Sequence, residues 1–316
     1  MNRAIWGVLC ALIFVSLESL QFVFFGGLFQ RMDSFLIGVL VFGGTAAGAI
    51  GLTLLRRPAQ LRIALANPGT LLVLNLCAAG GWIAYLLAVQ LIEPAVAFTL
   101  FCGAVPLTTL VAALCGMPEA SFVRNWIEAC GAILIALGLA VLIAITLAGW
   151  SGFVRGGVTV ALGGLALGIA SGAFIAFLML YARRLDIRGV GPMAQYGLRF
   201  PLYLVLSLGG VALGLDAKGE VPLEEIALAA ALGLFIMAFP IYAMQRAVSL
   251  VPTLTIGAMT SLGPLFVFGF QIIEGRVAHA PATLLGLSIY FAGALLAAFG
   301  GSRAEVRGER AARTAV

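Results

Sequence analysis

Apolar residues run along this chain in ten long stretches, which are separated by short polar or Gly- and Pro-containing connectors. Each stretch is close to the roughly 20 residues that an α-helix needs to cross the hydrocarbon core of a bilayer. The pattern therefore predicts an all-α integral membrane protein with ten transmembrane helices. We expect these spans at residues 4–25, 35–55, 69–90, 94–115, 126–148, 158–181, 192–214, 226–248, 253–273 and 282–300.

The composition strengthens this prediction. Hydrophobic residues make up 62% of the 316 residues and charged residues only 10%, and the mean hydropathy is +1.13. These values lie far outside the averages of soluble domains. The N-terminal stretch follows Arg3 as a signal peptide would, but it stays apolar for about 22 residues without a small-residue cleavage site, so we interpret it as a retained span.

The net charge of +5 does not indicate nucleic-acid binding, because the basic residues lie mainly in short connectors without an aromatic-interleaved basic face. Their distribution instead predicts orientation. With a cytoplasmic N-terminus, the residues on the inner side are Arg3, Arg56, Arg57, Arg62, Arg124, Arg183, Arg184, Arg188, Arg246, Arg303, Arg307, Arg310 and Arg313, and those outside are Arg31, Arg155, Lys218 and Arg276. We therefore expect both termini in the cytoplasm, with residues 301–316 as a solvated tail.

The two halves of the chain share the spacing of several prolines, glutamates and glycines. Two pairs of prolines are each twelve residues apart, and two Glu-Gly-Gly triads share spacings of 12 and 7. The matched positions are Pro94 with Pro106, Pro252 with Pro264, Glu119 with Gly131 and Gly138, and Glu274 with Gly286 and Gly293. We expect two five-helix repeats, 1–148 and 149–300, and because five is odd the second must be inverted, as in many secondary transporters.

Four segments resemble the EamA branch of the drug/metabolite transporter superfamily. They are "EPAVAFTLFCGAVPLTTL", "GAILIALG", "VPTLTIGAMTSLGPLFVF" and "EGRVAHAPATLLGLSIYFAG". Within this branch of ten-helix carriers the chain looks most like the YddG-type exporters of aromatic and other amino acids. The resemblance implies a central cavity surrounded by spans one, three, four, six, eight and nine, with spans five and ten packed outside. "CGMPE" departs from the family's tighter Gly-Glu ending of span four.

Glu18 and Gln21 interrupt the apolar run of the first span. Glu18 lies about 21 Å along the helix from its cytoplasmic end, beyond the midplane and too deep to reach the interface easily. Phe14 and Phe25 share its face or lie near it. We expect this face to line a cavity, where Glu18 carries a proton, binds a substrate ammonium, or forms a purely structural hydrogen bond to backbone.

Aromatic and amide residues at similar depth complete the candidate site. Trp82 and Tyr85 lie level with Glu18 or slightly outside it, although packing or an interfacial belt would also explain them. Tyr242 and Gln245 lie toward the cytoplasmic side of the span 226–248. The full set of substrate-binding or coupling candidates is Glu18, Gln21, Trp82, Tyr85, Phe98, Phe101, Phe174, Tyr242, Gln245 and Met259.

Prolines, glycines and arginines inside spans have more ordinary interpretations. Pro106 and Pro264 fall near mid-span, where each favours a kink that could shape the cavity. Glycines at four-residue spacing, Gly164, Gly168 and Gly172, indicate close helix packing inside the bundle. Arg199 lies about 11 Å nearer the cytoplasm than Glu18, so we expect it to extend toward the interface rather than pair with Glu18.

Other classes of protein fit poorly. The three aspartates and the one histidine lie far apart in connectors, so we expect no enzyme active site, metal site or cofactor. A channel would need charged or carbonyl rings that are missing from the pattern. The odd number of cysteines, all in apolar stretches of the first half, indicates packing residues rather than disulfides.

The sequence thus predicts a multi-pass carrier in the bacterial inner membrane that exports aromatic and other neutral or apolar amino acids by alternating access. Its partners would be a small-molecule substrate and the lipid bilayer, with no obligatory protein partner. The alternative is a proton-coupled exporter of lipophilic cations or other small metabolites, because one membrane acid among aromatic rings also suits a cation.

Overall fold

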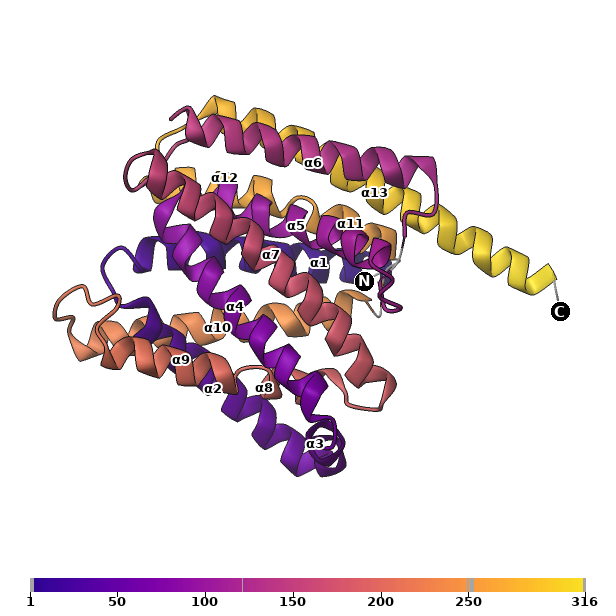
Figure 1. Ribbon diagram of the computed structural model, residues 1–316, viewed down its shortest axis with the longest axis horizontal. Coiled ribbons are helices and arrows are strands. Elements are labelled where there is room, and N and C mark those ends of the chain that lie inside the picture. Colours follow the sequence, from indigo (N-terminus) through magenta and orange to yellow (C-terminus); the bar gives the residue numbers. More distant parts are fainter. Residues whose placement is uncertain (1–2, 121, 249, 251–252, 315–316) are drawn as a thin grey trace.

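The computed structural model describes residues 3–120, 122–248, 250 and 253–314, and this part of the chain is helical almost throughout, without a strand (Figure 1). The helices pack side by side into one bundle, and the end of the last helix projects beyond it. They are α1 (Arg3–Leu28), α2 (Ser34–Arg56), α3 (Pro58–Leu65), α4 (Pro68–Leu91), α5 (Pro94–Leu114), α6 (Trp126–Leu147), α7 (Val158–Ile187), α8 (Pro192–Leu198), α9 (Pro201–Ala212), α10 (Leu223–Val248), α11 (Thr253–Thr260), α12 (Gly263–Glu274) and α13 (Pro281–Thr314).

Local sequence signals explain where these helices begin and end. Prolines occupy the first turn of seven described helices, where the missing N–H has no intrahelical partner to lose. Asp33 caps α2 by accepting hydrogen bonds from the N–H groups of Phe35 and Leu36. Gly275 ends α12 with a φ of +80°, a conformation that favours glycine.

Among the described residues, eight helical segments are long and apolar enough to cross a membrane, so the chain is an all-α protein of multi-pass membrane type. The expected span 192–214 is not among them, because it breaks into α8 and α9, of 7 and 12 residues. The expected span 226–248 falls on α10, which is described only in part. One short helix, α3, was not anticipated in the connector after α2.

Five connectors meet at one end of the bundle, which we call the bridged end. These connectors cover residues 29–33, 92–93, 148–157, 213–222 and 275–280. The N–H groups of Arg155 and Ala278 donate to the carbonyls of Leu91 and Gly152. Lys218 donates to the carbonyl of Met32 at 3.3 Å. These contacts hold the five connectors together at one end of the bundle.

The most extensive helix contact joins α6 and α13, which lie along one edge of the bundle (Figure 1). A methyl group added at Gly131 would lie 2.4 Å from the N atom of Ala297, and one at Gly138 would lie 2.7 Å from that of Tyr290. From the other side, a methyl group at Gly293 would lie 2.6 Å from the N atom of Ile135. Glycine is thus required on both helices for their backbones to approach this closely.

The glycine face of α7 packs inside the bundle, as expected. Added methyl groups at Gly164 and Gly172 would lie 2.6 Å from a side-chain carbon of Ile92 and 2.2 Å from the carbonyl oxygen of Phe101. This face therefore meets the beginning and middle of α5 rather than a second copy of the chain.

We predict that Gly138→Ala destabilises the fold by roughly 1 to 3 kcal/mol, because the added methyl group forces α6 away from the backbone of α13. The measurement is thermal unfolding of the purified protein in detergent. Gly48→Ala is the control, since nothing lies within 4 Å of an added methyl group there. Equal midpoints for the two variants would contradict the prediction.

Candidate functional site

A cavity of about 710 Å³ lies inside the helical bundle. Residues of α1, α4, α5, α7, α11 and α13 line it, together with Ile135 of α6, Arg199 between α8 and α9, and Ser261 between α11 and α12. The lining covers Ser171 to Ala182 on α7 and Tyr290 to Ala298 on α13, and both helices begin at the bridged end, well before these residues. The cavity therefore extends from the middle of the bundle toward the end where α1 begins, which we call the N-terminal end.

This lining differs in part from the arrangement that the family resemblance implies. Spans five and ten were expected outside the cavity, yet Ile135 of α6 and Tyr290, Ala294, Ala297 and Ala298 of α13 form part of its wall. None of the lining residues that the structure describes comes from α10.

Glu18 lines the cavity together with Phe14, Gln21 and Phe22 of α1. Phe25, which was expected on or near this face, instead stacks on Phe29 with ring centroids 5.1 Å apart. The adjacent Ser19 fixes this face, because its buried hydroxyl donates to the carbonyl oxygen of Gly263 at 3.1 Å. Among the described residues, no Lys or Arg forms an ion pair with Glu18. A carboxylate in this position is free to hold a proton or a cationic group.

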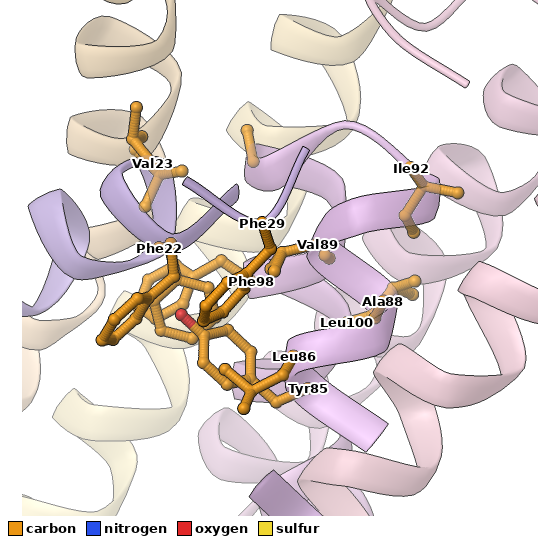
Figure 2. Close-up of a cluster of buried hydrophobic side chains, with 14 of the residues drawn as sticks. Phe22, Val23, Phe29, Tyr85, Leu86, Ala88, Val89, Ile92, Phe98 and Leu100 are labelled. Carbon is orange, nitrogen blue, oxygen red and sulfur yellow. The ribbon is translucent and has the colours of Figure 1, made fainter. Parts of the chain in front are cut away.

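Aromatic rings close the cavity on the side of the bridged end. The ring of Phe22 lies 4.2 Å from that of Tyr85 and 4.1 Å from that of Phe98, measured between centroids, so α1, α4 and α5 meet here (Figure 2). Phe101 and Trp82 extend the group, with the Trp82 and Tyr85 rings 5.4 Å apart. All five residues line the cavity, including four of the sequence-predicted candidates.

The break between α8 and α9 brings an unexpected charge to the cavity. In a continuous helix the N–H of Leu202 would donate to the carbonyl of Leu198, four residues earlier. The Asn75 amide instead accepts from Leu202 N at 3.2 Å and donates to Leu198 O at 2.8 Å. Arg199 lies within this opened turn and lines the cavity, rather than reaching the interface as the sequence suggested.

Buried polar side chains hold the bridged end together. The Glu93 carboxylate, 0% exposed, accepts from the N–H of Gly152 and the hydroxyl of Thr283, each at 2.8 Å, and from the amide of Gln271. Burial raises the pKa of the Glu93 carboxyl, although these donors oppose the shift. The network joins both halves of the chain across the end opposite the cavity.

A second network at the bridged end centres on Lys218. Its ammonium pairs with Asp216 at 2.5 Å and donates to the side chain of Gln90 at 3.0 Å. Asp216 also accepts from the hydroxyl of Ser34 at 2.6 Å. Neither network was anticipated, because connector residues give no sequence signal of burial.

Ion pairing is sparser at the N-terminal end. Arg184 of α7 donates twice to the carboxylate of Glu119, at 2.5 and 2.9 Å. These hydrogen bonds hold the pKa of the Glu119 carboxyl below its ordinary value. Glu274, the expected counterpart of Glu119, instead meets Arg276 at the bridged end, at 3.3 Å.

Several predicted candidates do not reach the cavity. Phe174 is 39% exposed and its ring covers Gly80 on the outer side of α4. Met259 packs against a small cluster that contains Cys10, Ala11 and Ala247. The side chains of Tyr242 and Gln245 lie outside the described residues.

The two predicted kinks also turn out differently from each other. Pro106 lies inside the continuous helix α5 and lines the cavity. Before Pro264 the helix is interrupted at residues 261–262, and the proline stands in the first turn of α12. The reason is that Pro264 has no N–H for the carbonyl of Thr260, so α11 ends there.

No family model and no curated protein matches the chain. One solved structure, titled "Crystal structure of protein", matches with a TM-score of 0.60 over 95% of this chain and 98% of that chain, at 18% sequence identity. The two proteins thus share a fold over nearly their whole lengths. Among the described residues, no group of three His, Cys, Asp or Glu side chains could hold a metal ion.

We predict that Asn75→Leu destabilises the protein by roughly 2 kcal/mol, because the N–H of Leu202 and the carbonyl of Leu198 lose their partners. Thermal unfolding in detergent checks this. Thr45→Val is the control, because the Thr45 hydroxyl only adds a bond to a carbonyl of its own helix. A loss for Asn75→Leu no larger than for the control would show that the amide is not needed at the break.

Proposed function

We propose that this protein is a secondary-type carrier of the bacterial inner membrane that exports aromatic and other neutral or apolar amino acids by alternating access. The observation that carries the proposal is the central cavity. Its volume of about 710 Å³ lies within the range of small-molecule sites. It combines a lone carboxylate with aromatic rings, and it extends toward one end of the bundle only.

The pairing of helices supports ten spans in two inverted repeats. Taking α8 and α9 as one span, and α11 and α12 as another, each major contact has a counterpart in the other half. The contact of α1 with α10 corresponds to that of α7 with α4, and the contact of α5 with α7 corresponds to that of α12 with α1. Such exchangeable halves can build two conformations around one site.

The glycine contacts support the same relation at the level of residues. The repeat matches Gly131 with Gly286 and Gly138 with Gly293. The contact of Gly138 with Tyr290 then has its counterpart in that of Gly293 with Ile135. A two-fold axis between α6 and α13 produces this reciprocity, since a contact from i to j returns as one from j to i.

The arginine distribution gives this geometry a direction. With both termini in the cytoplasm, the bridged end faces outward and the cavity extends inward. The structure then represents an inward-facing carrier. Substrate would enter from the cytoplasm, and the aromatic group of Phe22, Tyr85 and Phe98 would separate it from the outer side.

An exporter of lipophilic cations is the second candidate, and the free carboxylate of Glu18 beside aromatic rings favours it. Arg199 in the same cavity counts against it, because an unpaired guanidinium repels a cation. Uptake of ethidium without any amino-acid uptake in proteoliposomes would favour this candidate over the first.

We predict that Glu18→Gln abolishes the stimulation of labelled tryptophan transport by a pH gradient, because an amide cannot exchange a proton. The purified protein is assayed in proteoliposomes with and without the gradient. Glu224→Gln, which changes an exposed carboxylate at the start of α10, serves as the control. Full and equally pH-sensitive transport by Glu18→Gln would rule out a coupling role for Glu18.

A further inference from the structure

Arg199 occupies an unusual position for an arginine in an apolar chain. It lies in the opened turn between α8 and α9 and lines the central cavity. Its guanidinium carbon lies 4.2 Å from the centroid of the Tyr196 ring and 4.9 Å from that of Phe200. Within the described residues, its buried Nε atom has no hydrogen-bond partner and no carboxylate forms an ion pair with it.

The guanidinium shares a side-chain hydrogen bond with Tyr196, but its buried Nε has no hydrogen-bond partner among the described residues. An anionic ligand would relieve the remaining cost of burying this charge. The geometry of the break adds to this preference. α9 begins at Pro201, directly after Arg199 and Phe200, so the positive end of its helix dipole lies beside the guanidinium. Interrupted helices bind the carboxylates of transported substrates in this way in other carriers.

Glu18 supplies the opposite charge in the same cavity. The two side chains do not form an ion pair, although both line the cavity. The cavity therefore contains one negative and one positive group. An α-amino acid carries an ammonium and a carboxylate on the same carbon atom, so it offers a group of opposite charge to each side chain.

We propose that Arg199 binds the carboxylate of a zwitterionic amino acid whose ammonium faces Glu18. The inference rests on the proposed function and names the chemical requirement of its site, which is a free carboxylate on the substrate. The guanidinium fork of Arg199 suits this task, since it can donate two parallel hydrogen bonds to a carboxylate.

A connected set of rings accommodates the rest of the substrate. Phe42 packs between Phe200 and Trp82, at centroid distances of 5.0 and 4.7 Å. The buried Nε1 of Trp82 also lacks a partner among the described residues. An apolar or aromatic substrate side chain can lie against Trp82 while its carboxylate reaches Arg199.

The test compares three probes in proteoliposomes containing the full-length protein: tryptophan, tryptophanamide and tryptamine. All three share the indole ring and the amino group, and only tryptophan has a carboxylate. We expect the wild type to take up tryptophan with a KM about 10- to 100-fold lower than the KM for either analogue, as expected for one charge-assisted contact.

Two substitutions at Arg199 sharpen the comparison. Arg199→Gln should raise the KM for tryptophan about 10- to 100-fold and leave the KM values of the two analogues unchanged or lower. Arg199→Lys keeps the positive charge but lacks the planar guanidinium. Its KM for tryptophan should therefore fall between those of the wild type and of Arg199→Gln. Arg188→Gln is the matched control, because this arginine pairs with Asn67 outside the cavity and should leave all three KM values unchanged.

Different outcomes test the role of Arg199 and the proposed function of amino-acid export. Equal wild-type uptake of tryptophan and tryptophanamide would overturn the role of Arg199 while leaving an amino-acid carrier intact. The wild-type comparison holds even if Arg199→Gln fails to fold. A wild type that does not transport tryptophan, but does transport ethidium, would instead overturn the proposed function.

Discussion

Backbone groups that leave a helix inside a membrane must find partners within the protein, and this constraint determines where the chain can open. At the break between α8 and α9, the Asn75 amide takes over both ends of a lost helical hydrogen bond, from Leu202 N to Leu198 O. At the break between α11 and α12, the hydroxyl of Ser261 donates to the carbonyl of Ala258 at 2.8 Å. Both breaks border the cavity. Arg199 and Ser261 thus reach the cavity at points where the interrupted backbone is supported by side chains.

The same constraint shapes the charges. A continuous helix through residues 192–214 would let Arg199 follow the surface toward water, but the opened turn places it over Tyr196 and against the cavity. Glu18 remains on the continuous α1, held by the contact of Ser19 with Gly263. Opposite charges in a medium of low polarity attract strongly at short range. Because Glu18 and Arg199 lie on separately supported helices, they line the same cavity without forming an ion pair with each other.

The sequence predicted those parts of the site that disturb an apolar pattern. Glu18, Trp82 and Tyr85 are conspicuous within their spans, and all three line the cavity. Depth was counted along uninterrupted helices, so the broken turn at Arg199 could not be foreseen. Asn75 gave no signal either, since its role depends on a contact 123 residues away. Phe174 and Met259 were predicted to line the cavity but do not. An aromatic or sulphur-containing residue in a span can equally face the outside or a local cluster, and periodicity does not distinguish these cases.

The two ends of the bundle differ in what must be broken to open them. At the bridged end, Glu93 and Lys218 each join three or more groups from both halves of the chain. At the N-terminal end, Glu119 and Arg184 form a pair near the surface, which contributes little to stability. Among the described residues, the bridged end is therefore the more strongly connected of the two ends. Under the proposed function, a substrate that joins Glu18 to Arg199 would draw α1 toward the α8–α9 break, and its binding free energy would have to separate the bridged connectors.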